Sequence, residues 1–195
     1  RWRASLLEAT TRLDEVAARD GLTGLAMRPE FEALLQSFAG AKTEGSRPRL
    51  ALLYLGLDGL RTVNDLHGHA AGDAVLKAVS KRLQAVAGER PAARIAGDEF
   101  VVLTEGAADQ ARALSRALLT AIAEPIPMAG QEVRLTGSVG IALYPDHGSR
   151  SRLMANAAAA MRSVKMAGGG AHAEYQPLMG GNLRDQIELA RDLQK

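Results

Sequence analysis

The chain has 195 residues, a net charge of +2 and a content of 47% hydrophobic and 24% charged residues, which is ordinary for one globular domain with some flanking helix. It contains no cysteine, which excludes disulfides and thiolate metal sites and agrees with a reducing, cytoplasmic compartment. The basic residues form no run or stripe of the kind that binds nucleic acid, and no apolar run reaches the length of a membrane span.

The apolar pattern predicts helices that alternate with strands along the chain. A helix over 3–19 is interrupted by the glycines of DGLTGL, and a continuous apolar run over 49–57 is typical of a central strand. Gly137 and Gly140 are expected to bend a strand over 131–145. The other predicted elements are helices at 28–38, within 64–87 and at 108–123, 151–168 and 183–195, a hairpin at 93–105 and a strand at 172–176. This order predicts an α/β (α+β) sandwich with a mostly antiparallel central sheet flanked by helices.

Two adjacent acids, Asp98 and Glu99, lie at the tip of the predicted hairpin. Acids on a turn are often only solvated, but here Ala96 and Gly97 precede them and an apolar strand follows. Small residues let a ligand approach the backbone closely. Paired acids at a strand end, beside an acid-bearing loop on the neighbouring strand, form the geometry of a two-metal phosphoryl-transfer site.

The segment NDLHGHAAGD, residues 64–73, is a second candidate site. Gly68 and Gly72 are expected to form a flexible turn before a helix, which places Asp73 near the helix N-terminus, where an acid also has a purely structural use. Asn64 is equally compatible with a simple turn. His67 and His69 have no third ligand nearby in the sequence, which favours structural or solvated histidines over a metal site.

Five separated segments resemble GGDEF domains in their order and spacing: DGLTGL, LDGLRTVNDLHGHAAGDAVL, RIAGDEFVV, SVGIALYP and AMRSVKMAG. The resemblance covers residues 20–176, so that we expect linker helices at 1–19 and 177–195. The tail LRDQIELARDLQK resembles the helix that leads into an EAL domain, which hydrolyses or binds cyclic di-GMP in composite proteins. Because the chain begins with Arg1 and ends in charged, helix-like sequence, we expect it to be a piece of such a GGDEF–EAL protein.

The resemblance implies a fold similar to the nucleotidyl cyclases and the polymerase palm, and a homodimer that condenses two GTP molecules into cyclic di-GMP. The 3′-hydroxyl of one GTP attacks the α-phosphate of the other with the help of two Mg²⁺ or Mn²⁺ ions. The matching positions are Asn64 and Asp73 for guanine, Asp98 and Glu99 for metal and catalysis, the Leu57 carbonyl for metal, Lys165 for phosphate, and Arg94 for the arginine that precedes the signature.

The sequence departs from the family pattern at several positions. Gly56 stands where active members carry the Asp that binds both metals, and two divalent cations need several anionic oxygens. Asp58 shares the strand face of Gly56 but matches a different Asp of the family. Gly169 replaces an arginine that contacts phosphate. The signature reads AGDEF, with Ala96 as its first residue, Met27 replaces an Asn, and the RxxD motif of the inhibitory product site is absent from VAGERPAAR.

These departures predict a degenerate GGDEF domain that has lost cyclase activity but keeps its guanine readers. Such a domain would bind GTP, with Mg²⁺ or Mn²⁺ if nucleotide is bound, or mediate dimerisation, and would thereby regulate an adjoining EAL domain. Two alternatives stay open: an active cyclase in which Asp98, Glu99 and Asp58 suffice for metal, and an inert spacer that transmits signals. We expect no nucleic-acid partner and no membrane contact by this part, whereas the attachment of the parent protein to a membrane stays open.

Overall fold

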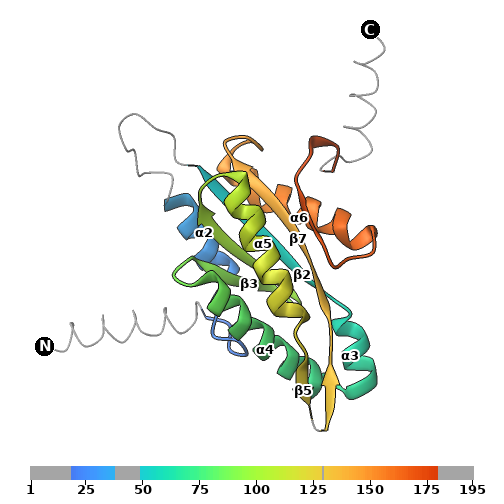
Figure 1. Ribbon diagram of the computed structural model, residues 1–195. Coiled ribbons are helices and arrows are strands. Elements are labelled where there is room, and N and C mark those ends of the chain that lie inside the picture. Colours follow the sequence, from blue (N-terminus) through green and yellow to red (C-terminus); the bar gives the residue numbers. More distant parts are fainter. Residues whose placement is uncertain (1–18, 38–48, 129, 180–195) are drawn as a thin grey trace, which may run out of the picture.

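A computed structural model describes residues 19–37, 49–128 and 130–179 (Figure 1). The α-helices are α2 (Arg28–Ser37), α3 (Leu60–His67), α4 (His69–Ala87), α5 (Ala108–Ala123) and α6 (Arg150–Met166), followed by a 3₁₀ turn, η1 (Pro177–Met179). The strands are β1 (Ala26–Met27), β2 (Leu50–Asp58), β3 (Ala92–Ala96), β4 (Glu99–Glu105), β5 (Ile126–Met128), β6 (Gln131–Val133), β7 (Thr136–Tyr144) and β8 (His172–Glu174).

Six of the strands form one sheet in the order β1-β3-β4-β2-β7-β8, and β5 pairs with β6 in a separate two-stranded sheet. The central pairs β3/β4, β4/β2 and β2/β7 are antiparallel, whereas the two edge pairs, β1/β3 and β7/β8, are parallel. The predicted α/β sandwich with a mostly antiparallel sheet is therefore confirmed.

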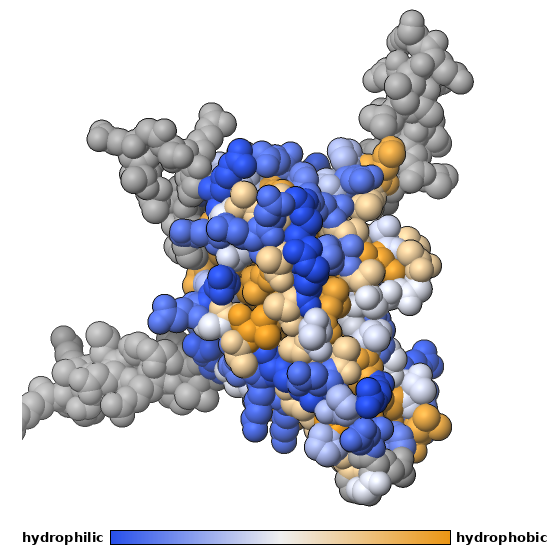
Figure 2. Space-filling view, viewed as in Figure 1, coloured by the Kyte–Doolittle hydropathy of each residue, from blue (hydrophilic) through white to orange (hydrophobic). Residues whose placement is uncertain are grey.

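Strand β2 lies at the centre of the sheet because its apolar run is buried on both faces. Leu53 and Leu55 face one core, which α4 and α5 cover with side chains such as Val79 and Leu118. Leu52 and Tyr54 face the other core, to which α2 and α6 contribute residues that include Phe31, Leu153 and Met161. Figure 1 shows α4 and α5 crossing the near face of the sheet, and Figure 2 shows apolar residues between bands of hydrophilic ones on that face.

The helix predicted within 64–87 is in fact two helices. Helix α3 begins four residues earlier, at Leu60, and Gly68 with φ 82° separates it from α4. Gly72, expected in a flexible turn, lies inside α4, where a Cβ would overlap Oδ1 of Asn64. This glycine therefore allows α3 and α4 to approach closely and does not form a turn.

The strand predicted over 131–145 is also divided, into β6 and β7, and its two glycines do not bend it. Gly137 and Gly140 lie within the regular pairing of β7 with β2. A Cβ at Gly140 would overlap backbone atoms of α6 at Ala157 and Met161. The glycine is required because α6 packs directly on β7, an approach that the strand pattern of the sequence does not reveal. Strands β1 and β5 were not predicted.

The helices predicted over 3–19 and 183–195 lie outside the described residues, apart from Arg19, which makes an isolated bridge to Ala26. The domain limits at residues 20 and 176 therefore stay predictions. Among the described residues, no helix combines the length and the apolar character that a bilayer-spanning helix needs.

Candidate functional site

The sheet brings the tip of the β3–β4 hairpin to the end of β2. Gly56 and Glu99 are directly opposite in the antiparallel register, and the Leu57 amide donates a hydrogen bond to the Asp98 carbonyl oxygen at 3.1 Å. The hairpin tip that carries Asp98 and Glu99 therefore lies beside Gly56, the position that lacks a carboxylate.

Lys165, in the last turn of α6, joins this cluster. Its ammonium nitrogen Nζ donates to the Leu57 carbonyl oxygen at 2.9 Å and lies 3.1 Å from Oδ2 of Asp98. The lysine reaches these atoms by passing over Gly56, where a Cβ would lie 2.6 Å from Lys165 Cε and 2.9 Å from Nζ. The Lys165 side chain therefore occupies the space that a side chain at position 56 would fill.

Asp58 is fully engaged with the neighbouring backbone and hydroxyl groups. Its carboxylate accepts hydrogen bonds from the Thr136 hydroxyl at 3.0 Å, the Ser138 hydroxyl at 2.9 Å and the Gly170 amide at 3.0 Å. It thereby fastens the loop after α6 to β2 and β7. A Cβ at Gly169 would lie 2.7 Å from Asp58 Oδ2, and the φ of 74° at Gly169 disfavours any side chain there.

Glu99 binds Tyr54, two residues before Gly56 on β2. Its carboxylate accepts a hydrogen bond of 2.6 Å from the hydroxyl of Tyr54, whose pKa is raised well above its ordinary value by burial and, second, by this hydrogen bond. Tyr54 therefore stays protonated and acts as the donor. The sequence analysis missed Tyr54, although a single polar atom within the apolar run of β2 signals a buried hydrogen bond.

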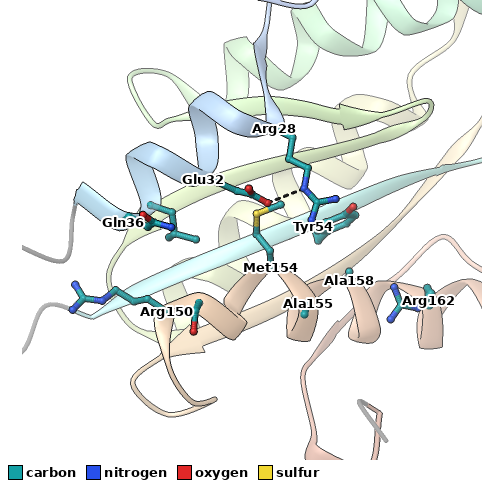
Figure 3. A pocket seen from close by; sticks show the side chains of 11 residues that line it. Arg28, Glu32, Gln36, Tyr54, Arg150, Met154, Ala155, Ala158 and Arg162 are labelled. Carbon is teal, nitrogen blue, oxygen red and sulfur yellow. Dashed lines mark hydrogen bonds and ion pairs between the residues drawn. The ribbon is translucent and has the colours of Figure 1, made fainter. Parts of the chain in front are cut away.

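Tyr54 forms part of the wall of a cavity of about 680 Å³ between α2 and α6. Figure 3 shows Arg28 and Glu32 on the α2 side, joined by a hydrogen bond of 2.7 Å, and Met154 and Arg162 on the α6 side. The signature acid Glu99 is thus tied through Tyr54 to a cavity whose α2 side and Met154 lie outside the five segments that resemble the family.

Arg94 holds the hairpin in position. Its guanidinium donates to the Gly97 carbonyl oxygen at 2.7 Å and pairs with the Asp20 carboxylate at 2.9 Å, and both side chains are largely buried. Asp20 also accepts hydrogen bonds from the amide and hydroxyl of Thr23. The segment DGLTGL therefore anchors the arginine that precedes the signature, which gives both motifs a positioning role.

We expect Asp20→Asn to lower the free energy of unfolding by about 2 kcal/mol at neutral pH and by less in acid. Burial alone would raise the pKa of Asp20, but the hydrogen bonds from Thr23 and Arg94 outweigh it, so that the pKa lies below its ordinary value. The charged form therefore stabilises the fold above about pH 4, and this stabilisation is lost as the pH falls through the folded-state pKa. Urea unfolding of both proteins at several pH values measures the difference.

The exposed Asp109 supplies the matched control, because Asp109→Asn removes a carboxylate that is 91% exposed. It should change the stability little at any pH. A difference between Asp20→Asn and the unchanged protein that stayed constant from neutral to acid pH would contradict the assigned role of the Asp20 charge.

Asn64 lines a cavity of about 450 Å³ between α3, α4 and the hairpin, together with Arg94 and Asp98. Its Oδ1 atom is buried and has no hydrogen-bond partner within the described part of the chain. Asp73 is exposed on α4 and is not among the residues that line this cavity, although it shares a helix face with His69 and Leu76, which do. The guanine-reading role of this pair stays a prediction.

Arg61 was missed by the sequence analysis. It lines this cavity and also a neighbouring one of about 370 Å³ that contains Leu57, Lys165 and Gly169. Its side chain is 95% exposed and forms a long ion pair of 3.9 Å with Asp65. A basic residue in the first turn after a strand is the available signal, since such a residue can meet a phosphate at a strand end.

The residues present do not fit a two-metal centre. The described part of the chain contains no group of three or more His, Asp or Glu side chains placed to hold a metal ion. Asp98 is paired with Lys165, Asp58 with three donors, and Glu99 with Tyr54, while Gly56 offers no ligand. No step of chemistry by this chain is therefore assigned to a metal.

Comparison with known proteins agrees with the arrangement of these segments. Residues 17–171 match the family model described as "Diguanylate cyclase, GGDEF domain". The chain is 37% identical over 98% of its length to the bifunctional diguanylate cyclase/cyclic di-GMP phosphodiesterase MucR of Pseudomonas aeruginosa, and 38% identical over 82% of its length to the cyclic di-GMP phosphodiesterase NbdA of the same organism. The matches cover 28% and 21% of those relatives, so the chain spans about a quarter of their length.

The solved structures include the coiled coil and GGDEF domain of DgcB from Caulobacter crescentus in complex with c-di-GMP. It superposes with a TM-score of 0.79 at 26% identity, over 88% of this chain and 92% of that one. The fold expected from the sequence, that of the cyclases, is therefore confirmed. The chain belongs to the GGDEF family of diguanylate cyclase domains.

Proposed function

We propose that this chain is a GGDEF domain that does not synthesise cyclic di-GMP, and that it binds GTP to regulate an adjoining EAL domain. One observation carries the proposal: Lys165 occupies the Leu57 carbonyl and the Asp98 carboxylate, beside a glycine at position 56. A cyclase of this family needs those oxygens for metal, and here they hold an ammonium group instead.

The retained guanine readers support nucleotide binding. Asn64 offers an amide that can both donate and accept, and Asp73 offers a carboxylate that can accept from N1–H and N2–H of guanine together. Asn64 lines the cavity, and its Oδ1 is an acceptor without a hydrogen-bond partner among the described residues, which a bound guanine would supply. Arg61, which faces both cavities, adds a cation toward the phosphates.

Regulation of an EAL domain is supported by the relatives. The names of MucR and NbdA both include cyclic di-GMP phosphodiesterase activity, and both proteins are far longer than the part that this chain matches. A domain that binds GTP without consuming it would report the GTP concentration to a neighbouring phosphodiesterase, because a bound ligand shifts the population of the state that binds it more tightly.

We expect the purified chain to produce no cyclic di-GMP from GTP with either Mg²⁺ or Mn²⁺, and to bind GTP but not ATP in calorimetry. Adenine N1 is a hydrogen-bond acceptor, whereas guanine N1 carries a donor. The Asp73 carboxylate, which can only accept, would therefore bind guanine and not adenine. Chromatography of the reaction mixture measures whether cyclic di-GMP is formed. The appearance of cyclic di-GMP would show an active cyclase, and the absence of heat at millimolar GTP would reduce the domain to a dimerisation or spacer role.

A further inference from the structure

We propose that the Lys165 ammonium is the cation of this site: it occupies the position of a divalent metal, so that the chain binds a guanine nucleotide without Mg²⁺ or Mn²⁺. The statement about the metal stands on the geometry alone, whereas the statement about nucleotide rests on the proposed function.

The surroundings of the ammonium are those of a hard cation. Its two partners are a backbone carbonyl oxygen, at 2.9 Å, and a carboxylate oxygen, at 3.1 Å, which are the ligand types that Mg²⁺ takes in proteins. They come from two separate elements, the end of β2 and the tip of the β3–β4 hairpin, so the lysine connects them as a metal would. An ammonium has three donors, and the described residues use two of them.

The third donor is available to a ligand. Lys165 and Asp98 line the cavity of about 370 Å³ that also includes Leu57 and the glycines of the loop after α6. The lysine side chain is one-third exposed. A phosphate oxygen in this cavity would receive the remaining N–H, which is the interaction that a metal-bound phosphate would otherwise make with the ion.

A divalent cation cannot share this position with the lysine. It would lie within a few ångströms of a positive charge, where like-charge repulsion is strong, and would compete for the same two oxygens. The remaining acids nearby, Asp58 and Glu99, are already bound to other donors. Gly56 and Lys165 are therefore coupled: the glycine leaves the space through which the lysine reaches its ligands.

The test is a titration with Mn²⁺ in the absence of nucleotide. The electron paramagnetic resonance signal of the free ion measures how much Mn²⁺ remains unbound. Five proteins are compared: the unchanged chain, Gly56→Asp, Lys165→Gln, the double variant of these two substitutions, and Asp98→Asn. We expect no binding to the unchanged chain at millimolar Mn²⁺, and binding to the double variant that is about tenfold or more tighter than to Gly56→Asp alone. The new carboxylate can then serve the ion because the ammonium is gone.

Lys81→Gln is the matched control, because Lys81 is an exposed lysine of α4 outside the site, and circular dichroism checks the folding of every variant. Three results would overturn the proposal. The first is Mn²⁺ binding by the unchanged chain that Asp98→Asn removes. The second is equal binding by Gly56→Asp and the double variant. The third is a folded double variant that binds no Mn²⁺, because the position would then be no cation site.

A titration with GTP tests the consequence for nucleotide. Affinity in excess EDTA should equal or exceed affinity in Mg²⁺, since the ammonium interacts more strongly with the more highly charged free nucleotide. Binding that requires Mg²⁺ would overturn the proposal. If GTP binds in neither buffer, the proposed GTP binding is wrong, and the Mn²⁺ titration by itself still decides whether the lysine holds the cation position.

Discussion

Gly140→Ala should lower the free energy of unfolding by about 3 kcal/mol, as expected for overpacking against rigid backbone. The new methyl group would overlap the Ala157 carbonyl oxygen and the Met161 amide nitrogen, and would lie 3.0 Å from the carbonyl carbon of Ala160. These are backbone atoms of α6, and neither they nor the central strand pair β2/β7 can move aside without separating helix from sheet. Lys165 is carried by the same helix, so the substitution also displaces the candidate site.

Urea unfolding measures this effect, with Gly21→Ala as the matched control. Gly21 is exposed, and a Cβ there would meet nothing within 4 Å, so its replacement should change the free energy of unfolding by no more than about 0.5 kcal/mol. Gly137→Ala provides an intermediate case, because its Cβ would meet the flexible Leu55 side chain at 2.8 Å. Equal stabilities for Gly140→Ala and Gly21→Ala would mean that α6 does not pack on β7 as described.

The periodicity and length of the apolar segments were enough to predict most of the helices and strands. They did not predict how closely one element packs against another. The apolar run at 49–57 identified the central strand, and helix α5 matches its predicted bounds, because burial on one or two faces leaves a regular trace in the sequence. Gly140 and Gly72 were misread as a bend and a turn. Each is required by a neighbour from another element, and a sequence pattern within one element carries no sign of that neighbour.

The residues of the candidate site could be named from the sequence, whereas their partners could not. Asp98 and Glu99 are adjacent, yet one pairs with Lys165 and the other with Tyr54, because Asp98 lies in the hairpin turn whereas Glu99 is the first residue of β4. The sequence analysis assigned Asp58 to a different Asp of the family from the one missing at Gly56. In the structure, its carboxylate accepts hydrogen bonds from Thr136, Ser138 and Gly170. Those partners are far away in the sequence and depend on the completed sheet.

Gly72→Ala should separate nucleotide binding from stability, and we expect it to weaken GTP binding about tenfold or more. The added methyl group would overlap Asn64 Oδ1 and lie 2.9 Å from Cγ, so that the side chain must leave its place at the cavity. The three atoms nearest to the methyl group are all side-chain atoms of Asn64, and alanine favours a helix over glycine by about 1 kcal/mol. The free energy of unfolding should therefore change by less than about 1 kcal/mol, the size of this helix preference.

Calorimetry with GTP on Gly72→Ala, Asn64→Ala and the double variant tests whether the two residues act together. Asn64→Ala removes the proposed guanine reader directly, and the double variant should bind GTP no more weakly than Asn64→Ala, because the methyl group at position 72 then has nothing left to displace. Additive losses would instead mean that Gly72 affects binding by a route other than Asn64. Full GTP affinity in Asn64→Ala would refute the assignment of Asn64 to guanine and leave the buried, unpartnered Oδ1 atom without a ligand.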